Sequence, residues 1–239
     1  MSVKNGWIRK RKKRNRWRVM SYFPMFVDMK DKKCLVVGGG NVAYRKIVHM
    51  KNFEALITVV SPEIISEINN IKDIEIIEKS FEDSGAAIKD YDVVISATND
   101  SDLNHRISQK CQELKIPVNV VDCPSECSFI FPAYIKKGDV VAAFSSGGKG
   151  PVITQYLKKE SEDVVTEWLG EIADFIGSKR DKVKEIVPTE KGRKKVYKKI
   201  LEVGLQEKRL MSEEEIMEYI NDSNSSAIKQ IITNSDAEK

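Results

Sequence analysis

Short apolar runs alternate with helical patterns through the first half of the chain. Runs that are apolar throughout are typical of strands buried on both faces, and the segments between them carry apolar residues at helical spacing. Strands in regular alternation with helices predict a parallel sheet that is covered by helices on both faces. We therefore predict a doubly wound α/β domain over residues 21–122. Its strands are expected at residues 34–37, 56–60, 74–77, 93–97 and 117–121.

Three helical patterns lie between these strands. The first two are expected at residues 42–52 and 64–69. The third has apolar residues that recur every three or four positions, so it presents one apolar face to the sheet. That face carries Leu103, Ile107, Cys111 and Leu114.

The pattern changes after residue 122. Two β-like runs, at residues 128–131 and 140–144, flank a segment with a turn signal at residues 135–139. We expect a small strand-containing region over residues 123–160. It ends in a glycine-rich loop and in a helix whose first turn suits Pro151; this helix carries Val152, Tyr156 and Leu157.

Only helical patterns remain from about residue 161, so residues 161–239 are predicted to be an all-helical domain. Ser212 and Glu215 have the spacing of a capping box at the start of a helix. The polar residues after about residue 221 are expected to fray. Two apolar stripes are expected to pack in this domain: Val164, Trp168, Ile172 and Ile176, then Val196, Ile200, Leu201 and Leu205.

Composition excludes several classes of protein. No apolar run reaches about 18 residues, so no membrane-spanning helix is predicted. The four cysteines are scattered, which argues against a disulfide framework and favours the cytoplasm. The two histidines, His49 and His105, fall on predicted helices without a ligand pattern, so no metal site is predicted. Cys123 and Cys127 form a single C-x3-C pair, which lacks further ligands nearby.

The positive charge of the chain is concentrated at its start. The net charge is +4, but nine of the 40 Lys and Arg residues stand in residues 1–20 without any acid, leaving 31 against 36 acids. We interpret residues 1–20 as a basic disordered leader, or as translation from too early a start with Met20 as the first residue. A nucleic-acid or membrane-surface arm is the alternative, because Trp7 and Trp17 interleave with the charges. We expect neither nucleic acid nor membrane as a partner.

A glycine-rich turn follows the first predicted strand. Gly38, Gly40 and Ala43 match the G-x-G-x-x-G/A spacing of a dinucleotide-binding turn, which predicts a Rossmann-type domain. Gly38 permits the tight turn, Gly40 lets the backbone approach a pyrophosphate, and Ala43 lets the helix lie close to the strand. The helix offers unpaired N–H groups and its positive dipole end to the phosphates. The cofactor-binding candidates here are Gly38, Gly39, Gly40, Asn41, Val42 and Ala43.

Further cofactor candidates follow the second and fourth predicted strands. A dinucleotide site commonly has an acid that bonds to the ribose hydroxyls, but here the second strand ends at Ser61 and the acid, Glu63, stands two places later, so this part of the fingerprint is incomplete. No Arg stands near Ser61 to bind a 2′-phosphate, so NAD is the better choice of cofactor than NADP. The residues after the fourth strand are expected to line the cofactor crevice, with a solvated turn as the alternative; they are Thr98, Asn99 and Asp100.

Three segments together resemble the precorrin-2 dehydrogenase family, the NAD-dependent part of sirohaem synthases. They are YFPMFVDMKDKKCLVVGGGNVAYRK (residues 22–46), VNVVDCPSECSFIFPA (118–133) and VVAAFSSGGKGPVI (140–153). The resemblance covers residues 20–160 closely and the helical tail only loosely. It implies a Rossmann domain, a dimerisation region at 123–160 and a helical domain, in a homodimer. The implied reaction oxidises precorrin-2 to sirohydrochlorin with hydride transfer to NAD.

The resemblance assigns a catalytic role to Asp122, and the residues themselves permit it. Asp122 follows the last predicted parallel strand, at the edge where open α/β sheets place ligands. An aspartate is ionised at neutral pH and can take the proton that this oxidation releases. The alternative is an Asx turn that leads into Pro124.

The loop of Ser145 to Gly148 can bind a carboxylate or phosphate through its N–H groups, or can simply connect a strand to a helix. In the family this loop lies close to the tetrapyrrole, which makes Ser146 and Gly147 candidate substrate contacts. The usual family pattern has Ser before the proline, whereas this chain has Gly150 and so lacks a possible helix cap. Lys136, Lys137 and Lys149 are weaker candidates to recruit the polyanionic substrate.

Two other functions are compatible with this pattern. Some relatives also insert iron into sirohydrochlorin, which would make the chain a bifunctional dehydrogenase and ferrochelatase, although no histidine lies near the site motifs. A non-catalytic NAD-sensing regulatory module would explain the glycine turn but not the NVVDCP and SSGG segments. The chain stops short of a methyltransferase domain, so we expect another protein to supply precorrin-2.

Overall fold

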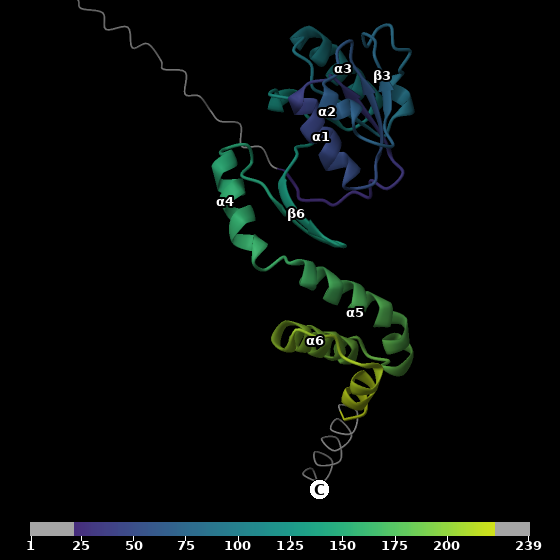
Figure 1. Ribbon diagram of the computed structural model, residues 1–239, viewed down its shortest axis with the longest axis vertical. Helices are drawn as coiled ribbons and strands as arrows, with labels where there is room; N and C mark the ends of the chain where they lie inside the picture. Colours follow the sequence, from purple (N-terminus) through teal and green to yellow (C-terminus); the bar gives the residue numbers. More distant parts are fainter. Residues whose placement is uncertain (1–21, 223–239) are drawn as a thin grey trace, which may run out of the picture. The chain divides into compact units, whose positions relative to one another are not determined.

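The computed structural model describes residues 22–222, which form two compact units: one ends at Phe131 and the other begins at Pro132. Figure 1 shows the first unit in purple through blue to teal and the helices of the second in green to yellow. The leader predicted at residues 1–20 lies outside the described residues, and so does nearly all of the tail expected to fray.

The first unit is built on a five-stranded parallel sheet with the strand order β3-β2-β1-β4-β5. This order is typical of the doubly wound sheet predicted from the apolar runs. Successive strands are added in one direction up to β3 and in the other direction from β4 onward, so the switch point of the topology lies between β1 and β4. The carboxyl ends of those two strands therefore border the crevice where such sheets bind ligands. The strands are β1 (Lys33–Val37), β2 (Leu56–Val60), β3 (Glu75–Ile77), β4 (Val93–Ser96) and β5 (Val118–Val120).

Helices cover both faces of this sheet, because alternate strand residues point to opposite sides. Cys34 and Val36 pack with residues of α1 (Asn41–Lys51) and α2 (Ser66–Asn69). Leu35 and Val37 pack on the other face, with residues of α3 (Ser101–Leu114) and the short 3₁₀ helix η1 (Ile88–Asp90). Ile107 and Cys111 are buried as predicted, whereas Leu114 in the last turn of α3 is exposed.

The strand predicted at residues 128–131 is wrong. The hairpin strands are β6 (Ala133–Lys137) and β7 (Val140–Phe144), which pair antiparallel around a turn at Gly138. Residues 128–131 instead run beside β5, where Asn119 donates a side-chain hydrogen bond to the Phe129 carbonyl. Their two phenylalanines pack against the core on the α1 side of the sheet. Residues 128–131 are therefore apolar because they cover this core, and not because they pair as a strand.

The second unit continues from the hairpin into helices α4 (Pro151–Glu162), α5 (Glu167–Ile186) and α6 (Glu190–Glu207), and then a helical segment at residues 213–222. The capping box is confirmed, since Ser212 and Glu215 exchange hydrogen bonds of 2.7 and 3.2 Å. Their core consists of residues such as Val183, Ile200, Ile216 and Ile220.

Both predicted apolar stripes are only partly buried. Val164 is exposed because α4 ends before it and α5 begins after its N-cap Thr166, which puts Val165 inside instead. Leu205 is exposed, and Val203 is buried in its place. On α4 the apolar Val152, Tyr156 and Leu157 are all exposed.

Among the described residues, no helix is both long and apolar enough to cross a membrane. All four cysteines are free thiols. Burial raises the pKa of the Cys34 thiol to about 12 and that of Cys111 to about 11. Within residues 22–222, no group of three or more His, Cys, Asp or Glu side chains is arranged to hold a metal ion.

Candidate functional site

Two glycines allow the turn after β1 to pack closely against the neighbouring loops. Gly38 has a φ of +121°, and a Cβ there would clash with the carbonyl oxygen of Ala97, just beyond β4. A Cβ on Gly39 would clash with the carbonyl oxygen of Glu63, and the Gly39 carbonyl accepts a hydrogen bond from Ile65 at 3.0 Å. These positions require glycine because three loops meet closely at the carboxyl edge of the sheet.

Gly40 has the opposite environment. A Cβ at this position would meet nothing within 4 Å, so its backbone faces open space. Gly40 is the N-cap of α1, and among the described residues no side chain caps this helix and no acid stands in its first turn. The first N–H groups of a helix have no acceptor within it, so α1 offers a site for an anionic group. Ala43, fully buried against the sheet, lets α1 lie close to β1.

The residues after β2 shape the adjoining loop. Ser61 is nearly buried, its N–H bonds to the Ile77 carbonyl, and its hydroxyl donates to the Glu63 carbonyl at 2.7 Å. The Glu63 side chain is exposed at this edge. Ser61 therefore supports the same loop that Gly39 contacts, and Glu63 is the acid available beside the glycine turn.

The residues after β4 form a hydrogen-bonded loop. Asp100 caps α3 by accepting from the N–H groups of Asp102 and Leu103 at 2.9 and 3.0 Å. The Thr98 hydroxyl accepts from the Asp100 N–H at 3.1 Å and donates to Asn104 Oδ1 at 2.7 Å. Asn99 is exposed between them. Thr98 and Asp100 thus hold the crevice loop in shape, and Asn99 is the side chain best placed to contact a ligand.

Sequence reasoning missed Asn104 at this point. Its Oδ1 also accepts from the buried Ser96 hydroxyl at 2.7 Å, and its Nδ2 donates to the Thr98 carbonyl at 3.0 Å. Asn104 thereby ties the end of β4 to α3. The sequence signal was weak, because most residues of α3 are polar and nothing in the pattern marks Asn104 among them.

Asp122 follows β5 in a left-handed conformation with a φ of +58°. The Asx-turn alternative is not realised, because the residue two places later is Pro124, which has no N–H to donate. Within residues 22–222 no hydrogen bond reaches the exposed Asp122 carboxylate. The carboxylate is therefore available for chemistry at the same edge as the glycine turn.

The segment after Asp122 is rigidly attached to the sheet and α3. Cys127 Sγ donates to the Val120 carbonyl at 3.1 Å and accepts from the Val120 N–H at 3.2 Å. Glu126 bonds to His105 Nδ1 at 2.7 Å through its side chain, and its carbonyl accepts from Ser108 at 2.8 Å. These bonds fix the backbone on which Asp122 stands.

Lys46, which sequence analysis did not single out, faces this segment from α1. Its Nζ lies 3.9 Å from the centre of the Phe131 ring. Burial and the neighbouring Arg45 lower the pKa of Lys46, while the charges of Cys127 and Asp122 act to raise it. The ammonium group and the Asp122 carboxylate are therefore close enough to interact.

The predicted substrate loop belongs to the second unit. Ser146 closes the loop on itself, because its hydroxyl accepts from the Gly150 N–H at 3.1 Å and donates to the Gly150 carbonyl at 3.0 Å. Gly147 and Gly148 both have a positive φ, of +61° and +78°. The Ser146 hydroxyl thus holds the turn into α4, where the N-cap Gly150 has no side chain to do so.

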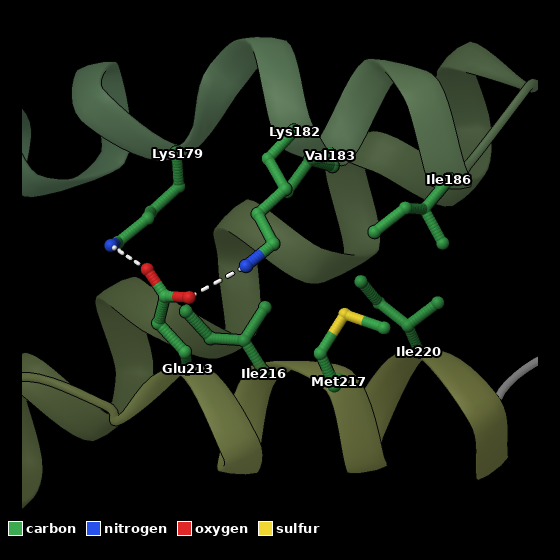
Figure 2. Close-up of a pocket in the computed structure, with 8 residues that line it drawn as sticks. All are labelled: Lys179, Lys182, Val183, Ile186, Glu213, Ile216, Met217 and Ile220. Atoms are coloured by element: carbon green, nitrogen blue, oxygen red, sulfur yellow. Dashed lines mark hydrogen bonds and ion pairs between the residues drawn. The ribbon is translucent and has the colours of Figure 1, made fainter.

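A hollow between α5 and the segment 213–222 is a packing seam and not a ligand site (Figure 2). Glu213 bonds to Lys179 Nζ at 2.8 Å and to Lys182 Nζ at 2.6 Å, so its charges are already paired. These two hydrogen bonds lower the pKa of Glu213 to about 2. The remaining lining is apolar: Val183, Ile186, Ile216, Met217 and Ile220.

Sequence comparisons relate the first unit to a family and most of the chain to longer proteins. A family described as "Putative NAD(P)-binding" matches residues 25–133. A siroheme synthase of Thioalkalivibrio sulfidiphilus (strain HL-EbGR7) is 39% identical over 186 residues, which cover 77% of this chain and 38% of that protein. A siroheme synthase of Ruthia magnifica subsp. Calyptogena magnifica is 40% identical over 169 residues, 70% of this chain and 35% of that protein. The chain thus spans less than two-fifths of the length of these relatives.

A solved structure shares the fold. It is described as "SirC, precorrin-2 dehydrogenase", and it matches with a TM-score of 0.60 at 23% sequence identity. The match covers 84% of this chain and 100% of that one. The α/β unit followed by a strand-containing and helical part is therefore an arrangement that another protein also adopts.

Proposed function

We propose that this chain is a member of the precorrin-2 dehydrogenase family and oxidises precorrin-2 to sirohydrochlorin with NAD as the hydride acceptor. The observation that carries this proposal is the Asp122 carboxylate, which accepts no hydrogen bond from the described residues, on the rigid segment after β5. It lies at the carboxyl edge of the same sheet as the open glycine turn. A base and a dinucleotide-binding turn on one edge are what this oxidation requires.

The chain's own residues fit an NAD pyrophosphate. The open backbone at Gly40 and the uncapped first turn of α1 supply N–H donors, with Asn41 and Val42 in that turn. Glu63 is positioned to accept hydrogen bonds from ribose hydroxyls, and its negative charge would disfavour the extra phosphate of NADP. Bound NAD supplies the hydride acceptor for this reaction.

Asp122 acts in this proposal as the general base. Removal of a hydride leaves a cationic macrocycle that must lose a proton, and an ionised carboxylate at the edge of the crevice can take it. The left-handed backbone and the bonds of Cys127 and Glu126 hold Asp122 in place, so little ordering is needed when the substrate binds.

The proposal includes a cytoplasmic homodimer. The exposed apolar residues of α4 support an interface between two copies, since large apolar side chains clustered on one surface favour burial against a partner. Tyr156 is 59% exposed and Val152 is 78% exposed on this helix. Four free thiols agree with a reducing compartment.

The test of the reaction is to mix the purified protein with NAD and precorrin-2 and to follow the absorbance of sirohydrochlorin. We expect Asp122→Asn to keep NAD affinity and to lose most turnover, by about 100-fold or more. Asp31→Asn is the matched control, because Asp31 is also exposed with a φ of +58°. Wild-type turnover in the Asp122 variant would remove this residue from the mechanism.

The same assay separates the other two functions. A sensor module would bind NAD without forming sirohydrochlorin. A bifunctional enzyme would also consume sirohydrochlorin when ferrous iron is added.

Sedimentation at micromolar concentration tests the homodimer. We expect the wild type to sediment as a dimer and Tyr156→Arg as a monomer. A monomeric wild type would contradict the interface.

A further inference from the structure

Among the described residues of the first unit, Lys46 and Lys51 are the two partly buried lysines, and only Lys51 forms an ion pair, with Asp73 at 3.7 Å. Lys137 and Lys179 have side chains that are 31% and 20% exposed, and each forms an ion pair, with Glu167 and Glu213 respectively. Lys46 is also partly buried, but within residues 22–222 no carboxylate oxygen lies within 4 Å of its Nζ. Its contact is the face of Phe131.

A partly buried ammonium group without a paired anion is costly, because it has lost water without gaining a counter-charge. The cation–π contact with the aromatic ring offsets only part of this desolvation cost. The neighbouring Arg45 adds positive potential, and together with burial it lowers the pKa of Lys46. An anion placed beside Lys46 would relieve this cost.

We propose that Lys46 binds a carboxylate of the substrate beside Asp122. The inference rests on the proposed function, in which the substrate is a tetrapyrrole that carries many carboxylates. Lys46 and Asp122 flank one segment of chain, the stretch from β5 to Phe131, and their charges interact. A macrocycle held through a peripheral carboxylate at Lys46 would have its ring beside the Asp122 carboxylate.

The position of Lys46 on α1 favours the substrate over the cofactor as its ligand. Lys46 is six residues beyond the N-cap Gly40, or roughly 9 Å along the helix axis. The pyrophosphate site is at the N-cap itself, where the first N–H groups are. The ammonium group is turned instead toward Phe131, on the side of the loop that carries Asp122.

The experiment compares Lys46→Met, which removes the charge, with Lys46→Arg, which keeps it. The control is Lys51→Met, because Lys51 is on the same helix but is already paired with Asp73 at 3.7 Å. Sirohydrochlorin is titrated into each protein without NAD, and the NAD dissociation constant and thermal midpoint are measured separately. We expect Lys46→Met to weaken sirohydrochlorin binding by about tenfold and to raise the KM for precorrin-2 similarly. Lys46→Arg and the control should stay within about threefold of wild type.

The outcomes separate this inference from the proposed function. The inference is overturned if Lys46→Met binds sirohydrochlorin with unchanged affinity. It is also overturned if this variant loses NAD affinity as much as sirohydrochlorin affinity and has a lower thermal midpoint, because Lys46 would then have a structural role. If Lys46→Met weakens sirohydrochlorin binding but the wild-type protein does not oxidise precorrin-2, the inference is upheld and the dehydrogenase activity is refuted. Oxidation at wild-type KM by Lys46→Met upholds the dehydrogenase and refutes the inference.

Discussion

The two units of this chain use polar groups in opposite ways. All six buried polar side chains among the described residues lie in the first unit: Thr58, Ser61, Ser96, Asn104, Ser108 and Asn119. Several of them brace the loops at the edge of the sheet, as Ser61 and Asn104 do. The second unit has an apolar core with charged pairs such as Glu213 with Lys179 at its surface. Buried polar side chains are thus concentrated where loops must keep a shape for binding.

Each unit carries its own spectroscopic or chemical probe. The four cysteines are all in the first unit, and Cys34 is fully buried with a raised thiol pKa, so its alkylation reports the opening of the sheet. Trp168 is in the second unit, where its Nε1 donates to the Gly204 carbonyl at 2.7 Å. With Trp7 and Trp17 replaced by Phe, fluorescence reports the helices alone.

The largest effect is expected from Gly39→Ala. The added methyl group would clash with the backbone carbonyl of Glu63, which is held in place by the Ser61 hydroxyl. We expect the free energy of unfolding of the first unit to fall by about 3 kcal/mol. NAD binding should be lost as well. Urea titration with Cys34 alkylation should show the loss while Trp168 fluorescence is unchanged. Gly40→Ala is the matched control, since it meets open space and should weaken NAD binding with little effect on stability. Equal stability of both variants would refute the packing argument.

Asn104→Ala is expected to cost somewhat less, about 2 kcal/mol. It would leave the buried Ser96 hydroxyl and the Thr98 carbonyl without their partner. The same Cys34 measurement in urea reads this change, with the exposed Asn99→Ala as the control. If the two variants were equally stable, the buried network would not stabilise the crevice loop.

In the second unit the largest single-residue loss we predict is smaller still. Ser212→Ala removes the hydroxyl that accepts from the Glu215 N–H at 3.2 Å, so we expect about 1 kcal/mol of destabilisation. Trp168 fluorescence should report it, and Cys34 alkylation should not change. Ser161→Ala is a control, because that hydroxyl bonds only within its own helix, to the Leu157 carbonyl.

The smallest effect concerns the acid stability of the second unit. The pKa of Glu213 is lowered from 4.5 to about 2 by its two lysines. A lowered carboxyl pKa stabilises the fold above pH 4.5, and this contribution is lost as the pH falls toward 2. Glu213→Gln should therefore show a weaker fall of the Trp168 unfolding midpoint in this range than the wild type. Identical pH profiles would contradict the pairing seen in Figure 2.

Local patterns in the sequence determined most of the first unit. The apolar runs at β1, β2 and β4 predicted the parallel sheet correctly, because strand burial is recorded in consecutive residues. The placement of Asp122 at the end of β5 followed from the same reasoning.

Other features were decided only by tertiary structure. The apolar run at residues 128–131 covers a core instead of pairing, and Val164 falls outside its stripe because a helix ends before it. Asn104 gains its significance from hydrogen bonds to Ser96 and Thr98, which it can form only because α3 packs against the end of β4. Lys46 gains its significance from Phe131 and Asp122, which lie far away along the chain. Periodicity along a chain indicates which face of an element is apolar, but the groups that meet across loops depend on how the elements pack.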